Sequence, residues 1–368
     1  RTWGVFDIDT NRVDTGLLAA GCAPGERIAV LMHNSPEMVE VMFGAMKAGI
    51  CVVPLNLSVT DAAAAAMIAD CGAVAFAASH EQCRRFDSLA STLAGRVKLK
   101  LGIEAPDAAW QEYPAWLAWQ TPGTPALRVA PEDACNIIYS SGTTSVPKGI
   151  VHSHRCRYDT AYDLSIALRY HSGATVLSTL GLYSNISWVA LLCHVLCGAT
   201  LTIMPQFSAA ALASHIEVHR VTHSVFVPVQ LQRLLELEGV GTRDFSSLET
   251  IMVCGSPLPP AVKQAARDLL GCELIELYGL TEGLVTTLAP EDFDRKLASV
   301  GKPLPGIELK LIDDTGNEVN PGEAGEIVGT SRFLMDGYLN RPDATAEATW
   351  INADGARWLR TGDVGRID

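Results

Sequence analysis

The sequence has no cluster of basic residues. Its 368 residues include 28 lysines and arginines against 41 aspartates and glutamates, which gives a formal charge of −13. This balance argues against nucleic acid or an anionic membrane as the main partner, because both require clustered positive charge. A small anionic ligand is compatible with it, since loop amides can bind phosphate inside an acidic protein.

A disulfide framework is also lacking. The ten cysteines form no CxxC pair, and most stand among apolar neighbours, as Cys51 does. Scattered cysteines in a chain of this length indicate reduced core residues of a cytoplasmic protein. Cys193 and Cys197 flank His194 at helical spacing, but no fourth metal ligand is visible beside them.

Signals for export or membrane insertion are missing as well. The first residues lack the charged, apolar and small-residue regions of a signal peptide. The apolar stretch 186–204 approaches membrane-spanning length, but Gly198 divides it into a helical half and a β-like half. We therefore expect a buried helix followed by a buried strand, and no stable membrane insertion.

Hydrophobic residues make up 48% of the chain and charged residues 19%, which supplies material for buried cores and excludes intrinsic disorder. From Arg27 onward, short apolar runs alternate with amphipathic helical segments. This alternation predicts an α/β fold with mostly parallel sheets. We expect two stacked αβαβα-type subdomains within residues 1–297.

Two segments depart from this alternation. Residues 104–131 contain five prolines, three tryptophans and no periodicity, which predicts an irregular surface connection. From about Ala298, short apolar runs are separated by many glycines and prolines. This spacing predicts a small antiparallel sheet or β-barrel over residues 298–368.

Residues 139–149 offer side chains and backbone groups that could bind a phosphate. Hydroxyl groups, a glycine and the ammonium of Lys148 make a cradle for a polyphosphate, although the spacing of a Walker loop is absent. The alternative is an ordinary polar surface turn. The residues expected to contact phosphate are Ser140, Ser141, Gly142, Thr143, Thr144, Ser145 and Lys148.

Two further segments offer ligand-binding groups. Residues 277–283 follow a predicted strand, at the edge where open α/β sheets bind ligands. They combine an aromatic ring, a glycine, a hydroxyl and a carboxylate. Asp363 offers a carboxylate that could accept two ribose hydroxyls. Each segment alone is usually a structural turn, and only their combination in this order points to a nucleotide.

Five motifs in this order resemble the adenylate-forming superfamily of acyl- and aryl-CoA synthetases, peptide-synthetase adenylation domains and firefly-type luciferases. The motifs are SSGTTSVPKG, CGSPLPP, LYGLTEG, GEIV with GYLNRPDAT, and RWLRTGDVG. The resemblance implies ATP-dependent activation of a carboxylic acid with Mg²⁺, followed by thioester formation with coenzyme A.

The resemblance also implies roles for individual residues. Lys148, Thr281 and Glu282 would be catalytic, with Thr281 at the α-phosphate and Glu282 holding Mg²⁺. Tyr278 would stack on adenine, and Asp363 would bind the ribose. The ATP-binding residues implied beyond the phosphate loop are Gly255, Ser256, Pro257, Glu276, Leu277, Tyr278, Gly279, Thr281 and Asp363.

The sequence departs from the superfamily pattern in three places. Ser145 stands where a glycine is usual, and segment 181–185 lacks the histidine that many CoA ligases have there. The hinge and C-terminal lid domain of resembling proteins, with a second catalytic lysine, are absent from these residues. We therefore expect the sequence to be the N-terminal part of a longer enzyme.

The acid substrate is expected to be a simple acyl or aryl acid. Amino-acid-activating domains hold the substrate ammonium with an aspartate, whereas Ser184 occupies that position and no acidic residue lies between Leu180 and Leu212. An uncompensated ammonium would be costly there. The expected acid-pocket residues, of which the apolar ones could equally be ordinary core, are Tyr183, Ser184, Asn185, Trp188, Val229, Gly283 and Leu284.

Two alternatives stay open. One is a peptide-synthetase-type domain that loads a carrier protein, and the other is a module that binds ATP without catalysis. The expected partners are a small-molecule carboxylic acid, ATP and coenzyme A, without nucleic acid. The oligomeric state is open, a homodimer included.

Overall fold

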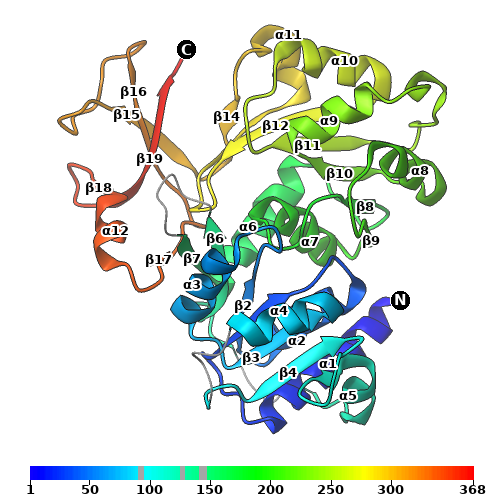
Figure 1. Cartoon of the computed structure of the whole chain (residues 1–368). Helices are drawn as coiled ribbons and strands as arrows, with labels where there is room; N and C mark the ends of the chain where they lie inside the picture. Colours follow the sequence, from blue (N-terminus) through cyan, green and yellow to red (C-terminus); the bar gives the residue numbers. More distant parts are fainter. Residues whose placement is uncertain (90–94, 125–128, 141–146) are drawn as a thin grey trace. The chain divides into compact units, whose positions relative to one another are not determined.

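The computed structural model describes residues 1–89, 95–124, 129–140 and 147–368 (Figure 1). Its contacts divide the chain into two compact units. Unit 1 comprises residues 1–155, 181–184 and 336–340. Unit 2 comprises residues 156–180, 185–335 and 341–368.

An eight-stranded sheet in the order β17-β7-β6-β2-β1-β3-β4-β5 forms the centre of unit 1. Neighbours from β6 to β5 pair in parallel, whereas the β6–β7 and β7–β17 pairs are antiparallel. The strands are β1 (Arg27–Leu31), β2 (Cys51–Pro54), β3 (Ala75–Ser79), β4 (Leu99–Ile103), β5 (Gln111–Glu112), β6 (Ala134–Ser140), β7 (Lys148–Ser153) and β17 (Gly337–Tyr338).

The helices of unit 1 begin where the sequence offers caps. The Ser35 side chain accepts the backbone N–H of Met38 at 3.2 Å, and Thr60 accepts that of Ala63 at 3.3 Å. Such caps satisfy backbone donors that a helix start leaves unpaired. The helices are α1 (Trp3–Ala19), α2 (Pro36–Lys47), α3 (Asp61–Cys71), α4 (His80–Leu89) and α5 (Tyr113–Trp119).

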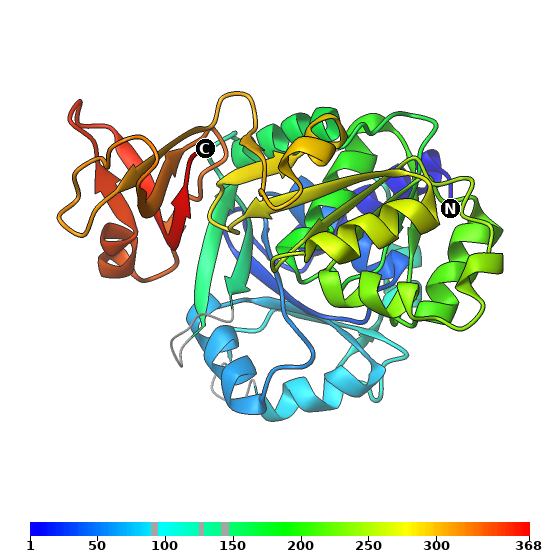
Figure 2. The same cartoon turned by 90° about the horizontal axis from the view of Figure 1, so that it is seen from above.

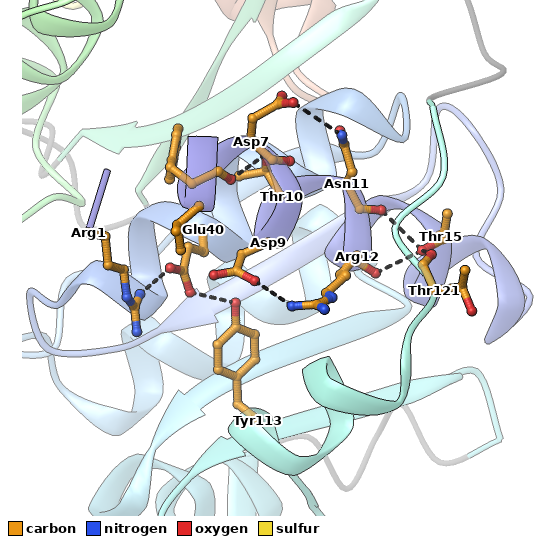
Figure 3. A network of polar contacts seen from close by, with 12 residues as sticks. Arg1, Asp7, Asp9, Thr10, Asn11, Arg12, Thr15, Glu40, Tyr113 and Thr121 are labelled. Atoms are coloured by element: carbon orange, nitrogen blue, oxygen red, sulfur yellow. Dashed lines mark hydrogen bonds and ion pairs between the residues drawn. The ribbon is translucent and has the colours of Figure 1, made fainter. Parts of the chain in front are cut away.

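Helix α5 corrects the prediction that residues 104–131 are irregular. Figure 3 shows why this segment is anchored: the Tyr113 hydroxyl donates to the buried carboxylate of Glu40 on α2 at 3.0 Å. Arg1 forms an ion pair with the same carboxylate. Burial raises the pKa of Glu40, and the Arg1 charge and the Tyr113 hydrogen bond oppose that rise.

A second, seven-stranded sheet lies in unit 2, in the order β14-β13-β12-β11-β10-β8-β9. The pairs from β12 to β9 are parallel, and the β12–β13 and β13–β14 pairs are antiparallel. The strands are β8 (Thr175–Ser178), β9 (Thr200–Ile203), β10 (His223–Phe226), β11 (Thr250–Cys254), β12 (Glu273–Gly279), β13 (Val285–Leu288) and β14 (Lys302–Pro303).

Helices α7 to α10 lie in sequence between the parallel strands of this sheet, as parallel connections require, and α6, α11 and α12 complete the helices assigned here. They are α6 (His154–Ala167), α7 (Asn185–Cys197), α8 (Ala209–His219), α9 (Pro228–Leu235), α10 (Pro260–Leu270), α11 (Phe293–Lys296) and α12 (Pro342–Glu347). The apolar stretch 186–204 divides at Gly198 into α7 and β9, as predicted, and the φ of Gly198 is +68°. The expectation that the strand is buried was wrong, because β9 lies at the edge of its sheet and its residues are exposed or only partly buried. Among the described residues, no helix combines the length and apolar composition that crossing a membrane requires.

A third sheet follows in unit 2, drawn in orange and red in Figure 2. It is a four-stranded antiparallel sheet in the order β15-β16-β19-β18, so the predicted β-barrel is corrected to an open sheet in the described part of the chain. In the described strands of this sheet, the edge strands β15 and β18 each pair with one neighbour and not with each other, so the sheet does not close. Its strands are β15 (Glu308–Ile312), β16 (Ala324–Thr330), β18 (Thr349–Ile351) and β19 (Arg357–Arg366). The predicted α/β fold with largely parallel main sheets is confirmed.

Candidate active site

The predicted phosphate loop is described only at its two ends. Ser141, Gly142, Thr143, Thr144 and Ser145 lie outside the described residues. Ser140 is the last residue of β6 and Lys148 the first of β7, and the two face each other in the antiparallel register. Lys148 is thus held by the β6–β7 pairing at the start of an antiparallel strand of unit 1.

An aromatic ring that the sequence did not single out lies against Lys148. The Lys148 ammonium is 5.0 Å from the centre of the Tyr338 ring, a distance typical of a cation–π contact. Strand β17 brings Tyr338 there by pairing with β7, and the N–H of Leu339 donates to the carbonyl of Gly149 at 2.7 Å. The signal in the sequence was the aromatic residue of the GYLNRPDAT motif.

In unit 2, the loop after β11 carries three of the predicted adenine-site residues. Gly255 has a φ of +102°, and a Cβ there would lie 3.2 Å from Ile186 and 3.3 Å from Val227. A larger residue would be strained at this position. Ser256 and Pro257 follow and are exposed to solvent.

The neighbouring strand β12 places Glu276, Leu277, Tyr278 and Gly279 beside this loop. Strands β11 and β12 run parallel with Cys254 opposite Leu277, so their carboxyl ends lie at the same edge. Glu276 and Leu277 are buried, and Glu276 accepts the backbone N–H of Leu258 at 3.0 Å. Gly279 is exposed at the end of the strand.

Tyr278 and Asp363, predicted from separate motifs, are brought together. The Tyr278 hydroxyl donates to Oδ2 of Asp363 at 2.8 Å. Burial, together with this hydrogen bond to a carboxylate, raises the pKa of Tyr278 above its usual range, so the hydroxyl stays protonated at neutral pH. The Asp363 backbone is itself fixed, because its N–H donates to the Thr361 hydroxyl at 3.0 Å.

Thr281 and Glu282 lie in the tight turn between β12 and β13. The N–H of Gly283 donates to the carbonyl of Leu280 at 3.1 Å, which closes the turn. The carbonyl of Glu282 accepts the N–H of Met335 at 2.8 Å. A Cβ on Gly283 would lie 2.3 Å from the carbonyl oxygen of Phe333, so only glycine permits this backbone approach.

A buried arginine on α6 lies against two of the predicted acid-pocket residues. Arg157 is 4% exposed, and its guanidinium donates to Oδ1 of Asn185 at 2.8 Å. It also lies 5.0 Å from the centre of the Trp188 ring, and Trp188 is fully buried. No pattern in the sequence pointed to Arg157, because its importance comes from packing between two helices.

The structure divides the remaining acid-pocket residues between the units. Tyr183 and Ser184 belong to unit 1, and burial raises the pKa of Tyr183. Val229 is 50% exposed on α9, whereas Leu284, directly before β13, is fully buried. Leu284 and Trp188 thus have the burial of ordinary core residues, which leaves their role as substrate contacts a prediction.

The opposite, amino-terminal edge of the seven-stranded sheet holds a different cluster. One ligand atom each from His171, His223 and Glu249 lies within 4.8 Å of the others. However, the two ring nitrogens of His223 contact the Arg169 carbonyl at 3.1 Å and the Thr222 hydroxyl at 2.8 Å. Both are engaged, so the cluster is better described as a His171–Glu249 pair beside a satisfied histidine.

A cavity of about 680 Å³ lies at this same edge, away from the predicted site residues. Its charged lining is paired within the protein: Arg169 with Glu273, and Arg267 with Asp294. Paired charges leave little for a charged ligand to gain. The carboxyl ends of β11 and β12 therefore remain the better candidate for the functional site than this cavity.

Known proteins resemble this chain in sequence and in fold. Residues 1–339 match the family described as AMP-binding enzyme. The chain is 30% identical to the fatty acid–acyl-carrier-protein ligase ScoC of Streptomyces coeruleorubidus, over 98% of this chain and 69% of ScoC. It is 31% identical to the indoleacetate–CoA ligase of Aromatoleum aromaticum, over 97% of this chain and 69% of that ligase.

A solved structure agrees with both matches. The inhibitor-bound N-terminal domain of FACL13 from Mycobacterium tuberculosis superimposes with a TM-score of 0.90 at 28% identity. The superposition covers 100% of this chain and 90% of that domain.

Proposed function

Because the chain belongs to the AMP-binding enzyme family of adenylate-forming ligases, we propose that it activates a carboxylic acid with ATP and transfers the acyl group to coenzyme A. The membership confirms the resemblance inferred from the five motifs. The observation that carries the proposal further is the hydrogen bond between Tyr278 and Asp363, which lie 85 residues apart in sequence. It brings together an aromatic ring that can stack on a base and a carboxylate that can accept hydrogen bonds from ribose hydroxyls.

The proposed first step joins two anions. An oxygen of the substrate carboxylate attacks the α-phosphorus of ATP, the bond from that phosphorus to the bridging oxygen breaks, and pyrophosphate leaves. Positive charge and hydrogen-bond donors must offset the repulsion and the charge that develops on the leaving group. We assign the charge to the Lys148 ammonium and the donor at the α-phosphate to the Thr281 hydroxyl.

The proposed second step transfers the acyl group. The sulfur of the coenzyme A thiolate attacks the acyl carbon, and AMP leaves with the former carboxylate oxygen. The thiol proton passes to solvent. A mixed anhydride is a far better acyl donor than a carboxylate, because AMP is a stabilised leaving group, and this is why ATP is consumed first.

Glu282 is the residue we assign to Mg²⁺. The ion prefers oxygen ligands and is commonly bound by one or two carboxylates together with substrate phosphates and water. The half-buried Glu282 side chain, in the turn after β12, supplies such a carboxylate. When bound, Mg²⁺ neutralises charge on the phosphates.

The proposed acid carries no ammonium group. Arg157 places a buried guanidinium 2.8 Å from Asn185, a predicted acid-pocket residue. A second positive charge beside it would be repelled in surroundings of low polarity. Together with the serine at position 184, this supports a simple acyl or aryl acid rather than an amino acid.

ATP–pyrophosphate exchange by the full-length protein, with a panel of acids, tests the adenylation step. Alkanoic or aryl acids are expected to support exchange, and Asp363→Asn is expected to lower it. Asp354→Asn, which alters an exposed aspartate in the turn before β19, is the matched control. Exchange with amino acids alone would overturn the substrate class. ATP binding without exchange for any acid would favour the non-catalytic module.

A separate assay decides the acceptor. The adenylate formed in situ is offered coenzyme A or a phosphopantetheine-bearing carrier protein, and thioester is measured by mass spectrometry. The similarity to ScoC, whose name gives an acyl-carrier-protein as its acceptor, makes the carrier protein the alternative. Thioester formation on the carrier protein and not on coenzyme A would overturn the proposed acceptor.

A further inference from the structure

A buried lysine lies at the first turn of α10, directly after the loop that follows β11. Lys263 is 2% exposed, and its ammonium forms an ion pair with the carboxylate of Glu276 on β12. The same ammonium donates to the carbonyl of Leu297 at 2.6 Å and lies 3.4 Å from that of Ser299. A lysine ammonium has three donors, and here three acceptors surround it.

Glu276 links this ammonium to the loop. One oxygen of its carboxylate faces Lys263, and the other accepts the backbone N–H of Leu258 at 3.0 Å. Glu276 is 3% exposed, so its charge needs a partner inside the protein. Lys263 supplies that partner as an ion pair, and removing one member of a buried ion pair leaves the other charge uncompensated.

The loop that Glu276 holds, residues 255–258, has little freedom at either end. At its start, the backbone of Gly255 packs so closely that a Cβ would approach Ile186 and Val227. At its end, Leu258 is buried, and Pro259 and Pro260 begin α10. The Leu258–Glu276 hydrogen bond therefore sets where the exposed residues Ser256 and Pro257 lie.

We infer that Lys263 is a positioning residue of the nucleotide site: through Glu276, it fixes the loop 255–258 and with it the surface that contacts adenine. The inference rests on the proposed function, which places this loop beside the base. A rigid loop discriminates between bases, because an incorrect base leaves buried polar groups unpaired. Lys263 thus contributes to the preference for ATP over GTP without touching either nucleotide.

The test replaces Lys263 with methionine in the full chain. In Lys263→Met, the KM for ATP is expected to rise about tenfold, and the preference for ATP over GTP to fall about tenfold. The reason is that Glu276 is no longer held in place to accept the hydrogen bond from Leu258. The KM for the acid is expected to stay within about twofold. Hydrogen exchange of peptides covering residues 255–259, measured without nucleotide, is expected to become faster.

Two further variants separate positioning from folding. Arg267→Met, on the same helix, removes a cation whose partner Asp294 is 79% exposed, and it is expected to change none of these readouts. Lys263→Met/Glu276→Gln leaves no unpaired charge and keeps an acceptor for Leu258. It is expected to fold even if the single variant does not, and to recover part of the ATP affinity.

The outcomes are distinct. A folded Lys263→Met with unchanged ATP KM and unchanged base preference would overturn the inference, and so would an equal rise in the KM for the acid. Absence of exchange in the parent with every acid would overturn the proposed function instead. Hydrogen exchange at residues 255–259 would then still show whether Lys263 holds the loop.

Discussion

The two edges of the seven-stranded sheet in unit 2 both carry charged and aromatic side chains, but they hold them differently. At the amino ends of the strands, cations and carboxylates pair with each other, as Arg169 does with Glu273 and Arg267 with Asp294. At the carboxyl ends, the buried Glu276 is also paired with a cation, Lys263, but the exposed Asp363 carboxylate is held by the neutral Tyr278 hydroxyl. A neutral donor orients a carboxylate without cancelling its charge.

This difference shows that abundance of polar groups does not identify a site. The amino-terminal edge has the cavity and the histidine cluster, yet its charges are already compensated within the protein. The carboxyl-terminal edge combines an oriented carboxylate with loops that only glycine permits, at Gly255 and Gly283. A nucleotide can bind to a carboxylate that is already oriented and to a loop whose backbone it can approach closely.

Glu282→Gln should give the largest effect at the carboxyl-terminal edge. Removing the carboxylate proposed for Mg²⁺ is expected to slow pyrophosphate exchange by at least about 100-fold. The melting temperature should stay close to that of the parent, because the turn is closed by backbone hydrogen bonds. An unchanged rate and an unchanged dependence on Mg²⁺ concentration would remove Glu282 from the mechanism.

Asp363→Asn should come next. Loss of charge-assisted hydrogen bonds to the ribose is expected to weaken ATP binding by about 1.5–3 kcal/mol. Calorimetric titration with ATP measures the change directly, and the Asp354→Asn control should bind like the parent. Equal ATP affinity of Asp363→Asn and parent would contradict the proposed ribose contact.

Much of the fold followed from local sequence signals. Gly198 ends α7, and Ser35 with Pro36 begins α2, because caps and helix breakers act on their own neighbours. Helix α5 was missed, since Tyr113 is anchored by a hydroxyl contact with Glu40, 73 residues away. The third sheet was expected to be either an open antiparallel sheet or a barrel, because turn spacing alone does not say whether the two edge strands pair with each other.

The candidate site was predicted unevenly for the same reason. Tyr278 and Asp363 lie in recognisable motifs, but their contact is visible only in the folded chain. Lys263 and Arg157 went unnoticed, because each stands in an unremarkable helical segment and gains its role from burial against another element. Sequence motifs name the groups that touch a ligand better than the groups that hold them in place.

Tyr278→Phe sharpens the comparison by removing the hydrogen bond and keeping the ring. The variant is expected to lose about 1 kcal/mol of ATP affinity, less than Asp363→Asn, because stacking on adenine is retained and only the orientation of Asp363 is relaxed. Titration of both variants side by side measures the difference. A loss as large as that of Asp363→Asn would mean that the hydroxyl itself binds the nucleotide.

Glu249→Gln should give the smallest effect, because it alters the amino-terminal edge. The His171–Glu249 pair is about half exposed on both sides, with side-chain exposures of 46% and 50%. Exposed pairs contribute about 0.2–1 kcal/mol to stability, so denaturant unfolding should shift by no more than that. ATP affinity and exchange rate should equal those of the parent.

Excess Zn²⁺ should leave the melting temperature of the parent unchanged, since both nitrogens of His223 are engaged. Stabilisation by Zn²⁺ that Glu249→Gln abolishes would show instead that this edge binds a metal, and the contrast between the two edges would fail.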